Sequence, residues 1–280
     1  MPIATQSYCW LRAEGMWLRI RRITIIEARK ILKKKSIWVL VSLLIVFQAL
    51  LTLFGIGLTG GTALDNGYQI SALSVKVSLQ FIVLFILVVS LKSISDEVSY
   101  GTIKIMLSNS VLRQDVVLSK FLAVCLLSWI LVVTVGVVGL VLGGFSAGMS
   151  DLKEGEYIIF SSFFLLKNYF YTIILTLLSL PPLVAYSILF SAVIRNPGAS
   201  VGFGIAIYFL LQVFSESYSI EEYSFTYYIF RPVGEYYRIA HGELHNLLTD
   251  LIHLIVSSSF YVVIFIVLAV YLVKRIDFWD

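Results

Sequence analysis

Charged side chains are scarce in this sequence: they make up 14% of the 280 residues, whereas hydrophobic residues make up 59%. A soluble domain usually has about 25% charged and about 45–50% apolar residues, so this deficit excludes an ordinary soluble fold. The apolar residues gather in long uncharged runs, each near the ~20 residues that a helix needs to cross a bilayer. Because the runs are continuous rather than alternating, they disfavour a β-barrel and predict an all-α, polytopic integral membrane protein.

Three further absences narrow the function. The sequence contains no G-x-x-x-x-G-K-[ST] phosphate loop, so we expect no ATP hydrolysis by that route and no enzymatic role for this chain. No Asp or Glu falls within the apolar runs, which disfavours an ion- or proton-coupled carrier. The only two cysteines, Cys9 and Cys125, lie in a basic segment and an apolar run, so they make no disulfide framework and are expected to be inert.

Histidines are also few. His241 and His245 have the i, i+4 spacing of metal ligands, but His253 would lie off their helix face. The set does not close, so we expect no metal site and interpret these residues as interface histidines.

The apolar runs predict six transmembrane helices. Their expected bounds are Ile37–Leu58, Ile70–Leu91, Phe121–Gly144, Tyr169–Ile194, Gly198–Phe214 and Leu251–Val273. The fourth contains Pro181-Pro182, which removes backbone donors and predicts a kink or break. Sixteen of the 21 lysines and arginines fall in the segments on one side of these spans. By the positive-inside rule, both termini and the connection between spans two and three are cytoplasmic.

Residues 16–35 (MWLRIRRITIIEARKILKKK) are basic and amphipathic. Four apolar residues share one helical face: Trp17, Ile20, Ile23 and Ile31. Such helices lie in the membrane interface, attracted by anionic headgroups, so we expect an in-plane interfacial helix. A charged anchor that only sets the topology is the alternative. Since Met16 begins this helix, residues 1–15 are expected to be a dispensable leader or the product of an upstream start.

Two other connecting segments have an unusual composition. Residues 96–118 place Ile103, Met106 and Leu107 at helical spacing, which predicts a short cytoplasmic helix with an exposed apolar face, or alternatively a solvated loop. Residues 215–250 hold six tyrosines, a density typical of the membrane interface. We expect short extracytoplasmic helices lying at or dipping into that interface, as an aromatic belt or as an outer gate.

Small residues recur at four-residue spacing in two of the spans. Gly139 and Gly143 on span three, and Gly198 and Gly202 on span five, have the GxxxG spacing that lets helices approach closely. We expect helix packing at these positions, either within one subunit or along a seam between subunits.

The cytoplasmic segment carries a resemblance to a known family. Glu97, the Gly101-Thr102 pair, Leu107, Arg113 and Lys120 follow the order and spacing of a motif of type-2 ABC exporter permeases. The basic N-terminal helix, six spans and cytoplasmic termini are similar as well, so the resemblance covers most of residues 1–280 as one permease domain. The sequence departs from the family pattern at Ser110, where the family usually has proline.

This resemblance implies a function. Segment 96–118 would be a coupling helix that docks on a separate ATP-hydrolysing subunit, which binds ATP and Mg²⁺, while this chain holds no cofactor. The other partners implied are a second permease copy or a homologous permease, and membrane lipids. The chain would be a permease subunit of an ABC exporter in a bacterial or archaeal cytoplasmic membrane, with no nucleic-acid partner. The uncharged span interiors favour an amphipathic or lipid-like substrate. The alternative is a non-transporting scaffold, immunity or sensor subunit that holds a cytoplasmic partner.

Overall fold

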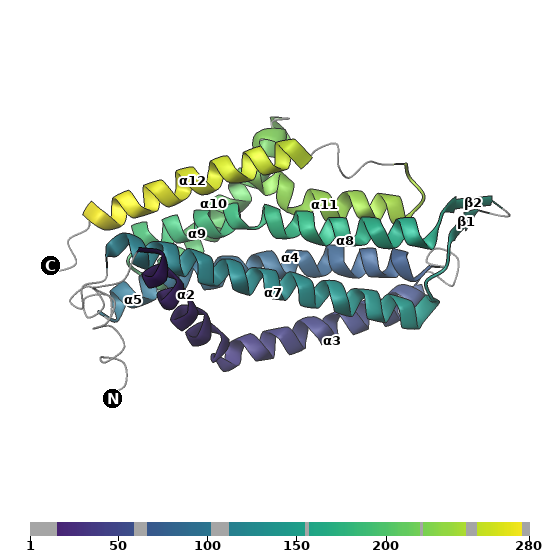
Figure 1. Cartoon of the computed structure of the whole chain (residues 1–280), viewed down its shortest axis with the longest axis horizontal. Helices are drawn as coiled ribbons and strands as arrows, with labels where there is room; N and C mark the ends of the chain where they lie inside the picture. Colours follow the sequence, from purple (N-terminus) through teal and green to yellow (C-terminus); the bar gives the residue numbers. More distant parts are fainter. Residues whose placement is uncertain are drawn as a thin grey trace.

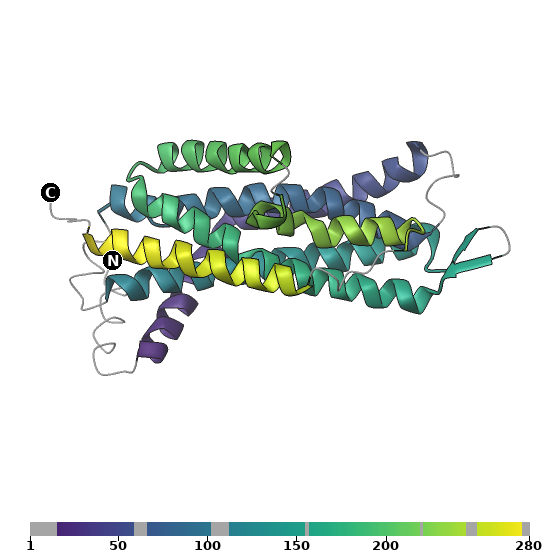
Figure 2. The same ribbon diagram turned by 90° about the horizontal axis from the view of Figure 1, so that it is seen from above.

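The computed structural model describes residues 16–58, 66–101, 112–154, 157–218, 221–244 and 251–275. Within these ranges the chain is an elongated bundle of helices with one small hairpin (Figures 1 and 2). The helices are α2 (Met16–Leu32), α3 (Lys35–Leu58), α4 (Gly67–Ser93), α5 (Ser95–Ser99), α7 (Arg113–Ala147), α8 (Ser162–Ser179), α9 (Pro181–Val193), α10 (Pro197–Ser217), α11 (Phe225–Ala240) and α12 (Leu251–Arg275), with a short 3₁₀ turn at Glu221–Tyr223. The antiparallel strands β1 (Leu152–Glu154) and β2 (Tyr157–Phe160) connect α7 to α8.

The predicted all-α polytopic fold is confirmed, because six helical segments in the described ranges are long and apolar enough to cross a membrane. The predicted third span, however, is only the middle of α7. This helix has 35 residues, so it is about 52 Å long and exceeds the ~30 Å hydrocarbon core. The excess at its beginning, residues 113–120, carries the polar side chains of the candidate site described below.

The predicted break at the double proline is also confirmed. Helix α8 ends at Ser179, and Pro181 begins α9. Proline suits the first helical position, where its missing N–H would have had no partner and its fixed φ is already helical. The fourth span therefore consists of two helices, α8 and α9, in succession.

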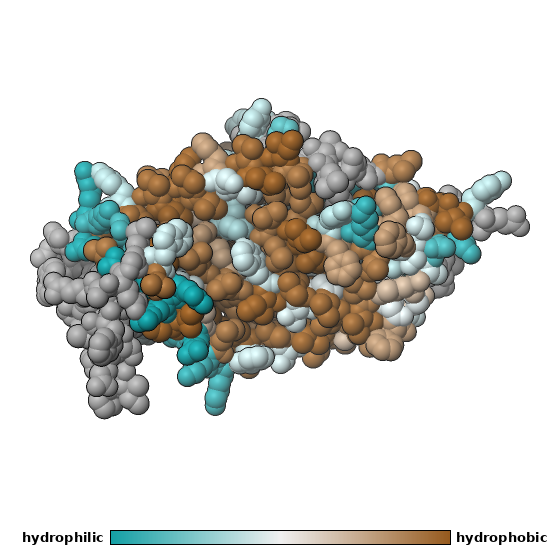
Figure 3. Space-filling model, in the orientation of Figure 1, coloured by the Kyte–Doolittle hydropathy of each residue, from teal (hydrophilic) through white to brown (hydrophobic). Residues whose placement is uncertain are grey.

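Helices α4 and α7 form the centre of the bundle. Gly67 of α4 faces Gly143 of α7 so closely that a Cβ atom on either residue would collide with the other's carbonyl oxygen. The buried side of α4 also carries small hydroxyl residues, Ser71, Ser74 and Ser78, which let its neighbours approach. Around this centre, α3, α10 and α12 expose large apolar side chains, as expected for helices that face lipid. Hydrophobic residues cover the middle of the face in Figure 3, and hydrophilic ones gather toward its ends.

The tyrosine-rich segment contributes a helix of the bundle. Helix α11 runs alongside α4 and α8 rather than across their ends (Figures 1 and 2). Tyr228, Ile229, Val233 and Tyr236 are on its buried side. The expected position of this segment at the outer membrane interface, as an aromatic belt or as an outer gate, stays a prediction.

Candidate functional site

Helix α2 lies obliquely across one end of the bundle, beside α5 and the first turns of α7 (Figure 1). Its apolar side chains Ile20, Ile23 and Ile31 are buried. Trp17, expected on the same face, is 77% exposed. The predicted helix is present, and it packs against α7. The location of this helix in a membrane interface stays a prediction.

Four charged residues from these three helices meet in one cluster. Oε1 of Glu97 lies 2.7 Å from Nζ of Lys30 and 2.8 Å from Nζ of Lys120. Lys120 also donates to Oε2 of Glu27 at 3.2 Å, and Lys30 lies 3.8 Å from Oε1 of Glu27. Glu27 and Lys30 belong to α2, Glu97 to α5 and Lys120 to α7, so the cluster fastens three helices to one another. We call these four residues the charge cluster.

Three of the four residues of the charge cluster are buried. Glu27, Glu97 and Lys120 are 4%, 5% and 2% exposed, whereas the side chain of Lys30 is half exposed. Removing a carboxylate or an ammonium from water costs several kcal/mol, and only close opposite charges offset that cost. Two acids and two bases balance within the cluster. The geometry of each member therefore depends on the others.

A second buried ion pair fixes α2 further along its length. Asp115, in the first turn of α7, is fully buried, and its Oδ2 lies 3.5 Å from Nε of Arg19. A carboxylate in this position is also favoured by the positive end of the helix dipole of α7. Helix α2 is thus attached to α7 by both Arg19 and Glu27.

Helix α5 is also held in place by α9. The hydroxyl of Ser191, on α9, accepts hydrogen bonds from the backbone N–H groups of Ile94 and Ser95, at 2.9 and 3.0 Å. These bonds fix the junction between α4 and α5. Glu97 is consequently presented to Lys30 and Lys120 from a fixed backbone.

The residues predicted for ATPase coupling fall on both sides of the segment that the structure leaves undescribed. Glu97 and Lys120 meet in the charge cluster. Gly101 has φ +68°, a left-handed conformation that favours glycine, directly after α5. Arg113 begins α7 and donates to the carbonyl oxygens of Val273 and Lys274 at the end of α12, at 3.2 and 2.9 Å. Thr102 and Leu107, like Ser110, lie outside the described residues.

Sequence reasoning did not anticipate the partners of Glu97. Lys30 is 67 residues away from it, in a segment expected to be an in-plane interfacial helix or, alternatively, a charged anchor that sets the topology. One signal was available: Glu27 is the single acid among residues 16–35. An acid that interrupts a basic stretch on its apolar side indicates a buried cationic partner.

The predicted helix-packing glycines divide into two groups. Gly139 and Gly143 pack against α4, where Cβ atoms would come within 3.0 Å of the Ser74 hydroxyl or collide with Gly67. A Cβ on Gly202 would meet nothing within 4 Å in the described chain, and one on Gly198 would meet only Asn196. The first pair therefore makes a contact within the subunit, whereas the second makes none there.

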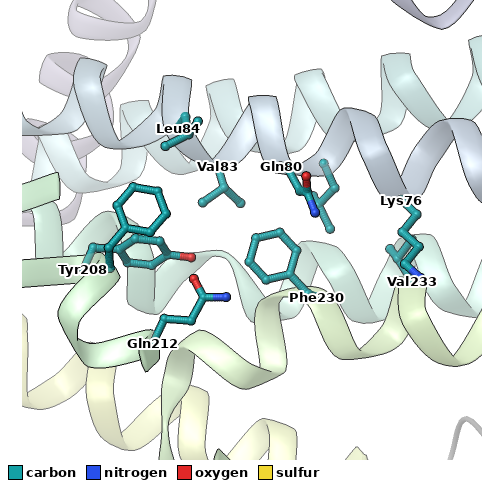
Figure 4. A pocket seen from close by; sticks show the side chains of 10 residues that line it. Lys76, Gln80, Val83, Leu84, Tyr208, Gln212, Phe230 and Val233 are labelled. Atoms are coloured by element: carbon teal, nitrogen blue, oxygen red, sulfur yellow. The ribbon is translucent and has the colours of Figure 1, made fainter. Parts of the chain in front are cut away.

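A partly polar pocket of about 420 Å³ lies among α4, α10 and α11 (Figure 4). The side chains of Gln80, Gln212 and Phe230 converge on it, together with the hydroxyl group of Tyr208. Tyr208 is 1% exposed, and its hydroxyl has no hydrogen-bond partner among the described residues. Lys76, at the border of the pocket, places its ammonium 4.2 Å from the ring centroid of Tyr237. The pocket combines aromatic surface, one cation, two side-chain amides and the Tyr208 hydroxyl.

Only two of the three histidines considered as metal ligands lie within the described residues. Nδ1 of His241 lies 2.7 Å from the carbonyl oxygen of Tyr237, and His253 is on α12, while His245 lies outside the described residues. Across the ranges that the structure describes, no three His, Cys, Asp or Glu side chains converge.

Comparison with protein families matches residues 23–212 to a family described as "ABC-2 family transporter protein". The matched range covers more than half of the 280 residues and includes α3 to α9, most of α10 and most of α2, with the charge cluster. Comparison with individual curated proteins gives no match. The resemblance to this family is thereby confirmed: the chain belongs to the ABC-2 family of transporter permeases.

Proposed function

We propose that this chain is the permease subunit of an ATP-driven exporter whose ATP hydrolysis takes place in a separate subunit. Family membership supports a membrane permease and, in general, an ABC ATPase partner. The observation that carries the proposal is the position of Glu97. Its carboxylate is shared between a lysine of α2 and a lysine of α7 at the end of the bundle from which segment 102–111 departs.

The charge cluster links the two helices that flank segment 102–111, because Glu97 of α5 and Lys120 of α7 form an ion pair. Segment 102–111 begins after α5 and returns at α7, and both helices carry cluster residues. A force applied to the segment by an ATPase acts on Glu97 and Lys120 together. Because these two groups are buried, separating them is costly, so α5, α7 and α2 move as one unit. Arg113 extends this connection to the end of α12.

The remaining parts of the proposal follow from family membership and the charge distribution. The ATPase binds ATP and Mg²⁺, and two permease copies, or this chain and a homologue, form the pathway. Residues 1–280 form one permease domain, with α2 as the interfacial helix and 96–118 as the coupling segment. Both termini face the cytoplasm of a bacterium or archaeon, as the excess of Lys and Arg at the α2 end of the molecule indicates.

The pocket among α4, α10 and α11 supports an amphipathic substrate. Phe209 and Phe230 offer apolar surface, while Lys76, Gln80 and Gln212 offer polar groups at the depth of the membrane spans. Ionisable and amide groups at this depth mark substrate pathways more often than they serve structure alone. A bare ion would leave the aromatic part of this lining without a role.

Purification of the tagged chain from its native membrane under gentle conditions tests the proposal. We expect an ATP-binding subunit to be recovered with it. In the reconstituted complex, Glu97→Gln is expected to lower substrate-stimulated ATPase activity at least about tenfold, a loss of about 1.4 kcal/mol of coupling. Glu243→Gln, which removes an exposed carboxylate after α11, is the matched control. Recovery of the chain without any ATPase, or equal activity of both variants, would refute the proposal.

A further inference from the structure

A second cavity, a groove of about 500 Å³, opens beside the charge cluster. It lies between the junction of α2 with α3 and the end of α4. Helices α2 and α3 meet there at an angle, as Figure 1 shows. The pocket of Figure 4 is lined by other residues, so the two cavities are separate.

The lining of the groove has two chemically different parts. Its apolar part is made by Phe85, Val88 and Val89 of α4 with Ile37 of α3. Its polar part includes Lys34, in the junction between α2 and α3, and Lys92, near the end of α4. Phe85 precedes Lys92 by seven residues, which is about 10 Å along a helix. The apolar part therefore extends away from the two lysines along the direction of the spans.

The charges of the groove do not balance. Glu27, Lys30, Glu97 and Lys120 also border it, but they offset one another in the charge cluster. This leaves Lys34, Lys92 and Asp96, of which neither lysine forms an ion pair with any described residue. Two cations and one carboxylate leave one positive charge, which a single phosphodiester anion would neutralise.

An exposed aromatic residue follows Ile37, which lines the groove, in the first turn of α3. Trp38 is one helical turn beyond Lys34 and is 61% exposed, and its indole N–H donates to the carbonyl oxygen of Leu32 at 3.0 Å. Tryptophan in this setting sits at the level of lipid headgroups. Beyond the groove, the exposed apolar side chain of Phe81 lies one turn from Phe85 along α4. An acyl chain that starts in the groove can therefore follow α4 into the hydrocarbon region.

We propose that this groove binds one anionic phospholipid of the leaflet at the α2 end of the bundle. Its phosphodiester lies between Lys34 and Lys92, and one acyl chain packs on Phe85, Val88 and Val89. A basic recess between transmembrane helices is a recognised type of site for anionic headgroups. The bound lipid contacts the outer side of the charge cluster, so its occupancy stabilises the arrangement of α2 against α5. Anionic lipid thereby becomes a regulator of the permease, independently of which substrate is moved.

Native mass spectrometry of the full-length chain tests this site. The chain is released from nanodiscs that contain equal amounts of phosphatidylglycerol and phosphatidylcholine, and the retained lipid is identified. We expect one phosphatidylglycerol per chain. Lys34→Gln/Lys92→Gln is expected to reduce its retention about thirtyfold, which corresponds to about 2 kcal/mol at 1.4 kcal/mol per tenfold.

The control variant is Lys33→Gln/Lys35→Gln, which removes the same number of charges from the two neighbours of Lys34, neither of which lines the groove. Retention in this variant should be unchanged, and Lys34→Arg/Lys92→Arg, which keeps the charge, should retain the lipid. Equal losses of phosphatidylglycerol in the two glutamine double variants would show that only the general surface charge matters, and would overturn the proposal. So would equal retention of the two lipids, or complete displacement by soluble glycerol 3-phosphate, which would indicate a site for a free anion.

Discussion

Replacement of Glu97 by glutamine is expected to destabilise the chain far more than replacement of its exposed partner Lys30. The Glu97→Gln change keeps the shape of the side chain but leaves Lys120, which is 2% exposed, with Glu27 as its remaining described anion, at 3.2 Å. Loss of one partner from a buried ion pair typically costs about 3–5 kcal/mol. Because Glu27 still compensates Lys120 in part, we expect the lower end of that range, about 3 kcal/mol.

The change Lys30→Gln removes an ion pair of the same length from the same carboxylate. Since the Lys30 side chain is 53% exposed, water screens its charge, and about 0–1 kcal/mol should be lost. Glu97 keeps Lys120 at 2.8 Å in this variant. The two substitutions therefore separate the buried half of the charge cluster from its exposed half.

Thermal unfolding of the purified chain in detergent measures the difference. At about 2 °C per kcal/mol for a chain of this size, Glu97→Gln should lower the Tm by about 6 °C and Lys30→Gln by about 2 °C or less. In a double-mutant cycle, Glu97→Gln with Lys120→Met should show a coupling energy of about 2 kcal/mol. Equal Tm shifts for the two single variants, or a coupling energy near zero, would refute the view that buried charge fastens α5 to α7.

Three further predictions concern the bundle and its orientation. Gly67→Ala should lower the free energy of unfolding by about 1–3 kcal/mol, seen as a lower Tm, because its Cβ collides with backbone carbonyl oxygens at the α4–α7 contact. Gly202→Ala is the control: its Cβ would lie in open space, so it should not destabilise the chain. Tyr186→Phe should lower the free energy of unfolding by about 1 kcal/mol, since the Tyr186 hydroxyl donates to a backbone carbonyl oxygen at 2.8 Å. Tyr208→Phe should leave stability unchanged, because the Tyr208 hydroxyl has no described partner. Equal effects of the two variants would contradict these hydrogen-bond assignments. Alkaline phosphatase inserted at residues 155–156 should be active and the same enzyme fused to the C-terminus inactive, and the reverse pattern would contradict cytoplasmic termini.

The bundle was predictable because its main signals are local. Runs of about twenty apolar residues predict spans without knowledge of their neighbours, and the double proline at 181–182 places the break between α8 and α9 at the correct residue. The beginning of α7 was not predictable in this way. Residues 113–120 look too polar for a membrane helix, yet Asp115 and Lys120 are buried there because α2 supplies Arg19 and Glu27. Hydropathy averages over neighbours in sequence, whereas these charges are compensated by residues more than ninety positions away.

The candidate site was only partly predictable, because its contacts also join residues that are far apart in the sequence. The motif drew attention to Glu97, Arg113 and Lys120, but spacing along the chain cannot show which of them meet. The structure brings Glu97 to Lys120, while Arg113 turns toward the carbonyl oxygens at the end of α12. The burial of Tyr236 in α11 is a similar case. Tyrosine density alone predicts an interface, and only tertiary packing reveals that one side of the helix is inside the bundle.

Helix α7 connects the candidate site to the opposite end of the molecule. Near its beginning Lys120 is fixed by two carboxylates, and near its end Gly143 is in backbone contact with Gly67 of α4. Gly143 follows Lys120 by 23 positions, which is about 35 Å of uninterrupted helix that transmits displacement with little bending. Helix α4 carries both Gly67 and several of the side chains that line the pocket of Figure 4, so one helix joins the contact with α7 to that pocket. At the Gly67–Gly143 contact the two backbones meet with no side chain between them, so a displacement of α7 there passes directly to α4.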